Sequence, residues 1–260
     1  MNSTTVRSLL VRGMLAGLAA GLLALVVAYF LGEPRINAAI AFEDSHSHEH
    51  EMEIVSRSLQ STAGLATGVL IFGVCLGGIA ALAFCFALGR VGRFTPRATA
   101  VLISGAALLT VFLVPFLKYP ANPPAVGDHD TIAKRTTLYF LMIALSVLLA
   151  VAAVILGKRL APRLGAWNAS VAAGAAYLFA IGLAYAFLPA INEVPADFPP
   201  TVLWQFRVSA IAVQLTLWTA FALSFGYLAE RVLTPRPATS AAEEANSESD
   251  TAARTAASAG

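Results

Sequence analysis

The stretch LLVRGMLAGLAAGLLALVVAYFL, residues 9–31, decides the fold class. It exceeds the roughly 20 apolar residues that a helix needs to cross the hydrocarbon core of a bilayer. Its only charged residue, Arg12, lies near its start. A secretory signal peptide has a shorter apolar core, although Ala-Ile-Ala at 39–41 keeps cleavage open as an alternative.

Five further apolar stretches follow, at about 64–88, 98–117, 137–156, 168–188 and 208–229. The 260-residue chain has only 12% charged residues, whereas soluble domains have roughly a quarter. Its mean hydropathy is +0.73. The sequence therefore predicts an all-α membrane protein with six transmembrane helices in residues 1–233. Residues 234–260 have no apolar periodicity and are predicted to form a disordered cytoplasmic tail.

The connections between these stretches differ in charge. Basic residues gather around the start of the first stretch, in 89–97, in 157–167 and after the last stretch: Arg7, Arg12, Arg90, Arg93, Arg97, Lys158, Arg159, Arg163, Arg231 and Arg236. The positive-inside rule places these regions, and both termini, in the cytoplasm. The polar loops 32–63, 118–136 and 189–207 are then outside, with ten of the fifteen acidic residues and all four histidines. Solvation alone is an alternative reason for these acids.

Small residues recur along the first two stretches at close to helical spacing, at Gly13, Gly17 and Gly21, and at Gly64, Gly68, Gly73 and Gly77. Small residues on one face of a membrane helix let two backbones approach closely. The pattern predicts tight packing within a bundle or between copies of the chain.

The first outer loop contains HSHEHE at 46–51, with His46, His48 and His50. Imidazole suits cobalt, nickel, copper and zinc, and the nearby Glu49 and Glu51 raise the local concentration of cations. The spacing puts the three imidazoles on one face of an extended chain. We therefore interpret the segment as a capture site for a divalent metal; a solvent-exposed His-rich linker is the alternative.

The second outer loop lies in the stretch VPFLKYPANPPAVGDHDTIAKRT, 114–136. Its prolines and glycine, Pro115, Pro120, Pro123, Pro124 and Gly127, should together prevent a continuing helix. Asp128, His129 and Asp130 form a second candidate metal cluster; a structured turn closed by Asp–Arg pairs is the alternative. The third outer loop is also rich in proline, and its acids are expected to bind a cation or to pair with arginines. The residues predicted to line a transport path or its entrance are Glu33, Lys118, Tyr119, Asn122, Arg135, Glu193, Asp197 and Arg207.

Several segments together resemble the CbtA family of predicted cobalt transporter subunits. They are GEPRINAAIAFE (32–43), GRVGRFTPRATA (89–100), FLKYPANPPAVGDHDTIAKRTTLYF (116–140), GAWNAS (165–170) and LPAINEVPADFPPTVLWQFR (188–207). The resemblance covers about residues 1–233. It implies a multi-pass protein of the bacterial inner membrane, cobalt uptake linked to cobalamin supply, and CbtB, a small single-span partner. It brings no established ligand residues.

We therefore predict a permease subunit for uptake of a divalent transition metal, and cobalt is the metal that we favour. No Asp or Glu lies in the middle of any apolar stretch, although membrane transporters often keep such residues for their ions. This favours the alternative, a non-transporting membrane scaffold or metal sensor. No Walker motif is present, and no nucleophile or ligand set indicates an enzyme. We expect no tightly bound cofactor and no binding of nucleic acid. The expected partners are membrane lipid, the divalent metal ion and further copies of the chain.

Overall fold

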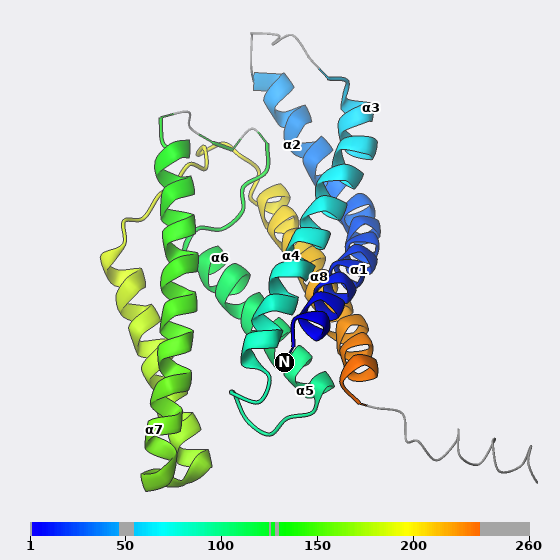
Figure 1. Ribbon diagram of the computed structural model, residues 1–260. Helices are drawn as coiled ribbons and strands as arrows, with labels where there is room; N and C mark the ends of the chain where they lie inside the picture. Colours follow the sequence, from blue (N-terminus) through cyan, green and yellow to red (C-terminus); the bar gives the residue numbers. More distant parts are fainter. Residues whose placement is uncertain (1, 47–54, 125, 128–129, 235–260) are drawn as a thin grey trace, which may run out of the picture.

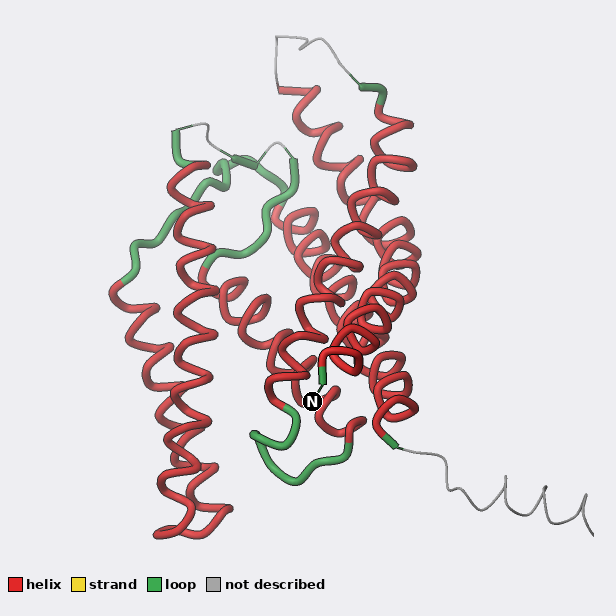
Figure 2. The backbone as a smooth tube through the Cα atoms, viewed as in Figure 1, coloured by secondary structure: helices red, strands yellow, loops and turns green. Residues whose placement is uncertain are grey.

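The computed structural model describes residues 2–46, 55–124, 126–127 and 130–234, and the regular secondary structure in these ranges is helical throughout. The prediction of an all-α protein is confirmed for these residues (Figures 1 and 2). The elements are α1 (Ser3–Val27), η1 (Ala28–Gly32), α2 (Glu33–His46), α3 (Arg57–Leu59), η2 (Gln60–Gly64), α4 (Leu65–Ala87), α5 (Pro96–Ala107), η3 (Leu108–Leu113), α6 (Val114–Lys118), α7 (Ile132–Phe187) and α8 (Pro200–Leu233). The three η elements are π-helical turns that continue the helices around them.

Within the described residues, five helical segments are long and apolar enough to cross a membrane: Ser3–Ser45, Arg57–Ala87, Pro96–Lys118, Ile132–Phe187 and Pro200–Leu233. The longest of them, α7, contains Gly165 with φ 77° and ψ 159°, which is not a helical conformation. Positive φ is accessible to glycine because it lacks a Cβ atom. The chain reverses direction near this residue, so α7 is a hairpin of two antiparallel arms, 132–164 and 166–187 (Figure 1).

Helices α1 and α4 meet through glycine. A Cβ atom added to Gly17 would lie 2.2 Å from the carbonyl oxygen of Gly73, and one added to Gly77 would lie 2.3 Å from that of Gly13. Backbone therefore touches backbone, as the glycine pattern predicted. Gly68 is different, because a Cβ atom there would meet nothing within 4 Å.

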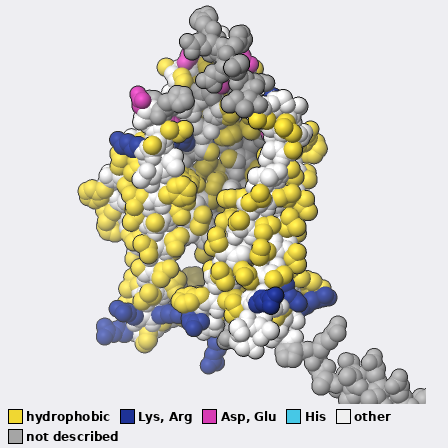
Figure 3. Space-filling model, turned by 45° about the horizontal axis from the view of Figure 1, so that its top comes forward, with side chains coloured by type: hydrophobic (Ala, Val, Ile, Leu, Met, Phe, Trp, Pro, Cys, Tyr) yellow, Lys and Arg dark blue, Asp and Glu magenta, His cyan; other side chains and the backbone are white. Residues whose placement is uncertain are grey.

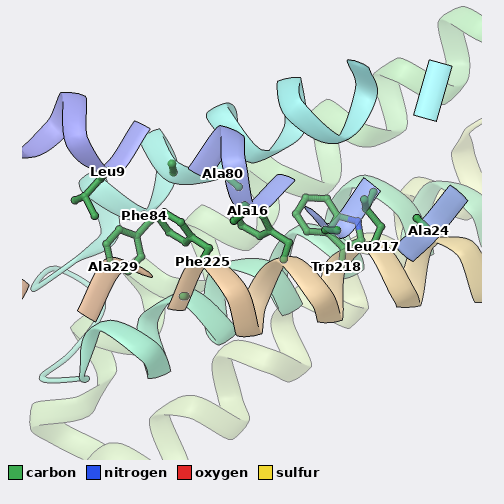
Figure 4. Packing of buried hydrophobic residues seen from close by; sticks show 13 residues of the cluster. Leu9, Ala16, Ala24, Ala80, Phe84, Leu217, Trp218, Phe225 and Ala229 are labelled. Carbon is green, nitrogen blue, oxygen red and sulfur yellow. The ribbon is translucent and has the colours of Figure 1, made fainter. Parts of the chain in front are cut away.

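The main core joins α1, α4 and α8, and α8 also packs against α5. The ring of Phe84 meets that of Phe225 edge-on, with centroids 5.1 Å apart (Figure 4). Phe225 also stacks on Phe221. Trp218 extends the same cluster along α8. Aromatic pairs of this geometry stabilise a core beyond the apolar area that they bury.

The α7 hairpin has a smaller core of its own. The hydroxyls of Ser146 and Tyr177 are hydrogen-bonded at 2.8 Å between the two arms, and Met142 and Ile181 pack beside them. Val114 of α6 joins this cluster. The hairpin therefore docks on the rest of the bundle chiefly through α6 and η3.

The predicted loop boundaries are wrong in one consistent way, because the helices extend into all three polar loops. Helix α2 runs to His46 and α3 begins at Arg57, so most of the loop predicted at 32–63 is helical. Helix α6 ends at Lys118 and α7 begins at Ile132, so both ends of the second loop are helical, and α8 begins at Pro200, inside the third loop. Hydropathy marks the part of a helix that suits lipid, whereas the backbone hydrogen bonds that define a helix continue into polar sequence.

The prolines of the second loop act as predicted at Pro120, Pro123 and Pro124, which lie in non-helical chain, but not at Pro115, which lies inside α6. The π-helical turns η1 and η3 each end two residues before a proline, Pro34 and Pro115. A proline ring clashes with the carbonyl four residues earlier and donates no hydrogen bond. A wider π turn gives that ring room, so the chain stays helical through both prolines.

Candidate functional site

One end of the molecule, which we call the loop end, is built from α2, the described residues of 119–131, residues 188–199 and the start of α8 (Figures 1 and 2). Ala39, Val126 and Phe198 form a buried apolar cluster there, one residue from each of the three predicted outer loops. The rings of Phe42 and Phe198 pack edge-on, with centroids 5.0 Å apart. The three connections therefore meet in space.

Arg135 and Glu193 form the centre of a polar network at the loop end. Nη1 of Arg135 donates to Oε2 of Glu193 at 2.9 Å, and the hydroxyl of Thr131 donates to Oε1 at 2.6 Å. The Glu193 side chain is only 2% exposed, so its charge is buried and paired. Nη2 of Arg135 also donates to the carbonyl oxygen of Pro120 at 2.6 Å.

Arg207 holds the same proline-rich segment from the α8 side. Its Nε donates to the carbonyl oxygen of Ala121 at 3.2 Å, and its Nη2 donates to Oδ1 of Asn122 at 3.1 Å. Residues 120–122 therefore receive hydrogen bonds from two guanidinium groups on two different helices. A planar guanidinium with several fixed donors suits such bridging better than an ammonium group.

Lys118 and Tyr119 attach the start of this segment to the end of α7. Nζ of Lys118 donates to the carbonyl oxygen of Tyr185 at 2.8 Å, and the Tyr119 hydroxyl donates to that of Pro189 at 2.9 Å. Burial raises the pKa of the Tyr119 phenol, because ionisation would place a charge in a poorly solvated position. We call the residues of these contacts the brace: Lys118, Tyr119, Asn122, Thr131, Arg135, Glu193 and Arg207.

Glu33 does not belong to the brace. It is 7% exposed and forms an ion pair with Arg57, whose Nε donates to Oδ1 of Asn37 at 3.1 Å. These contacts tie α2 to α3. A cavity of about 260 Å³ beside them is lined in part by Glu33, Asn37 and Ser61.

The structure places only part of the predicted metal clusters. His48, His50, Asp128 and His129 lie outside the described residues, and His46 is the last residue of α2. Asp130 is exposed in the turn before α7, and Asp197 is exposed in a turn of the third connection. Among the described residues, no three His, Cys, Asp or Glu side chains are grouped so that they could hold a metal ion.

Two residues in these contacts were not predicted from the sequence: Arg57, which pairs with Glu33, and Thr131, which donates to Glu193. Arg57 is one of two arginines in a connection whose other charged residues are acidic. An ion pair between Arg57 and one of these acids, such as Glu33, could therefore have been predicted. Thr131 carried no such signal, because a threonine just before a helix is ordinary. Its role follows only from the approach of Glu193 in space.

Within the helices, the buried polar side chains of the described residues other than Glu33 are all hydroxyls: Thr99, Ser104, Thr110, Ser146 and Ser209. The Ser209 hydroxyl joins α8 to η1 through the carbonyl oxygen of Leu31 at 2.9 Å. Ser104 Oγ is buried without a hydrogen-bond partner. Neutral oxygens of this kind can contact a partly dehydrated cation but do not compensate its charge.

The opposite end of the molecule, which we call the basic end, contains the positively charged connections. Lys and Arg side chains gather there in Figure 3. Nζ of Lys158 donates to the carbonyl oxygen of Arg90, which joins the first arm of α7 to the connection after α4. Arg97 pairs with Glu230 at 2.5 Å. Apolar side chains cover much of the surface between the two ends (Figure 3).

Long apolar helices, an apolar belt and two polar ends define a multi-pass helical membrane protein. A family model described as "Probable cobalt transporter subunit (CbtA)" matches residues 6–230. The chain belongs to this family, which confirms the resemblance found in its loops. The description names a transporter subunit, and the word subunit implies a complex. No curated protein and no solved structure matches the chain significantly.

Proposed function

We propose that the protein is the permease subunit of an uptake system for a divalent transition metal, with cobalt as the cargo, in the bacterial inner membrane. The observation that carries the proposal is the meeting of all three polar connections at one end of a bundle whose sequence belongs to the CbtA family. One shared surface at the end of the bundle is what an ion entrance requires.

In this proposal the chain crosses the membrane six times. Each arm of α7 is longer than the roughly 20 residues that a crossing needs, and Gly165 reverses the chain between them. The basic end then faces the cytoplasm with both termini, by the positive-inside rule. The loop end faces outward.

Capture of the ion is assigned to His46, His48 and His50, with Asp128, His129 and Asp130 as a second donor group. Both groups lie in connections that meet at the loop end. The brace fixes the walls between them, and Glu193 serves this purpose through its pair with Arg135 rather than as a free ligand. The entrance role of Glu33 is likewise replaced by a structural role in the pair with Arg57.

The energy for uptake is assigned to the membrane potential, which is worth about 2.3 kcal/mol per charge per 100 mV, or to a partner subunit. CbtB, the small single-span protein expected from the family resemblance, is the proposed partner. The weakly packed α7 hairpin leaves long apolar faces available for it. Cobalt is treated as cargo and not as a resident cofactor.

The alternative is a membrane scaffold or metal sensor that binds metal or a partner at the loop end without transport. The polar side chains buried in the helices favour this alternative, because in the described residues they are neutral hydroxyls apart from the paired Glu33. Neutral hydroxyls do not compensate the charge of an ion that crosses the membrane. A sensor needs the binding surface only, whereas a permease also needs a path.

Cobalt accumulation in cells separates the two functions. Cells expressing the protein, together with its partner where one is required, should accumulate more radioactive cobalt than cells without it. The triple change His46→Ala, His48→Ala and His50→Ala should weaken uptake at low cobalt concentration. The control changes Ser47→Ala, Ser56→Ala and Ser58→Ala in the same connection should not. Cobalt binding without any protein-dependent accumulation would establish the scaffold or sensor instead.

A further inference from the structure

A second cavity lies at the basic end, between the first turns of α1 and the last turns of α8. Its volume is about 680 Å³, and Arg7, Arg12 and Arg231 all line it. Within the part of the chain that the structure describes, no acidic side chain lines it. It is far from the loop end, and the proposed function does not use it.

The three guanidinium groups lack a negative partner among the described residues. Arg12 donates only to the carbonyl oxygen of Leu228, at 3.4 Å, and Arg231 lies over the ring of Tyr227, 4.5 Å from its centroid. The nearest acid in the sequence, Glu230, is paired with Arg97. Three like charges around one cavity repel each other, and an anion bound between them would relieve this repulsion.

The rest of the lining identifies the kind of anion. Thr4 and Ser8 add hydroxyl groups, which together with guanidinium groups are typical ligands of phosphate. The positive end of the α1 dipole adds to the same potential. Deeper along α1, the lining becomes apolar at Val11 and Leu15. A phosphate carried on an acyl chain matches both halves of this lining.

We propose that this cavity binds a phosphate-bearing anion, and that its source is the headgroup of an anionic phospholipid. The phosphate contacts Arg7, Arg12 and Arg231, and an acyl chain lies against the apolar residues. Arg12 is the informative member of the site, because it lies inside the first apolar stretch and is half-buried. A charge at that depth requires a compensating partner, which the lipid phosphate supplies.

The test uses the full-length protein purified in neutral detergent, with bound lipid counted by native mass spectrometry and thermal unfolding followed in parallel. Phosphatidylglycerol or cardiolipin should bind and raise the unfolding temperature, whereas phosphatidylcholine should not. Arg7→Gln, Arg12→Gln and Arg231→Gln together should weaken binding of the anionic lipid about 100-fold, since each arginine contributes about a factor of five. If this variant does not fold, Arg7→Gln alone should weaken binding about fivefold.

The control removes the same charge elsewhere at the basic end, with Arg93→Gln, Arg159→Gln and Arg163→Gln, and should keep the wild-type affinity. Binding of inorganic phosphate that prevents lipid binding would assign the cavity to a soluble phosphate compound. Equal lipid binding by the cavity variant and the control variant would overturn the proposal. Lipid binding that appears only after deletion of residues 235–260 would overturn it too, since the acidic residues of that segment would then be the occupant.

Discussion

Arg135 in the first turn of α7 and Glu193 in the connection before α8 form an ion pair whose acid is almost completely buried. The pair joins two polar connections that are far apart in sequence, and Thr131 supplies a further hydrogen bond to the carboxylate. A buried pair of this kind is costly to break, because the remaining partner keeps its desolvation penalty.

Glu193→Ala should therefore destabilise the protein by on the order of 3 kcal/mol, measured by denaturant unfolding in detergent micelles. The exposed pair of Arg97 and Glu230 is the matched control, with side chains 57% and 31% exposed. Glu230→Ala should cost less than about 1 kcal/mol. Equal losses in the two variants would mean that the brace contributes no more than a surface pair.

The contact between α1 and α4 leads to a second prediction. Gly17→Val would drive a side chain into the backbone of Gly73, so we expect a loss of about 3 kcal/mol or more, seen as early thermal unfolding or as aggregation in size-exclusion chromatography. Gly68→Ala is the control in the same helix pair, because a Cβ atom there meets nothing within 4 Å. A normal elution profile for Gly17→Val would rule out the close backbone approach.

Much of the fold could be predicted from the sequence, because a membrane helix requires a continuous apolar stretch of about 20 residues. The glycines were also informative, because a spacing of four residues places Gly13 and Gly17 on one face of α1, and Gly73 and Gly77 on one face of α4. The helical character of Glu33–His46 was not visible in hydropathy, since this segment is polar and its helix is defined by backbone hydrogen bonds. Pro115 misled the prediction, because the effect of a proline depends on whether the preceding turn can widen.

The site was predicted less completely, for a different reason. Residue types identified Arg135, Glu193 and Arg207 as a group of interest, but charge alone allowed either a cation site or ion pairs. The choice between them depends on which helices are neighbours, and the packing of α7 against the third connection decides it in favour of the pair. The partner of Glu33 was missed for the same reason.

Arg207 supports a third prediction, about rigidity. Arg207→Lys keeps the charge but cannot reproduce both hydrogen bonds, to Ala121 and Asn122, from one planar group. We expect faster hydrogen exchange of the amides in 119–122 and lower cobalt uptake, with the global unfolding temperature almost unchanged. Arg35→Lys on α2 is the control, since Arg35 lies outside the brace. Unchanged exchange in 119–122 would remove Arg207 from the brace.

Tyr119 gives a pH-dependent prediction. Its pKa is raised by burial above the value near 10 of an unfolded tyrosine. The resulting stabilisation is therefore fully present below about pH 10 and is lost as the pH rises through the higher pKa of the folded protein. Tyr119→Phe should lose about 1 kcal/mol at neutral pH with its hydrogen bond to Pro189. Its stability should then fall less steeply than that of the wild type at alkaline pH; parallel pH profiles would contradict the raised pKa.

The proposed orientation is tested by single cysteines in a background with Cys75→Ser and Cys85→Ser. The positive-inside rule puts the basic end in the cytoplasm, so His129→Cys should react with a membrane-impermeant maleimide in intact cells. Arg93→Cys should react only after the membrane is permeabilised, because it lies exposed at the basic end. The reverse labelling would place the imidazoles and carboxylates in the cytoplasm. The three meeting connections would then form an exit rather than an entrance, and capture of external cobalt by this chain would be ruled out.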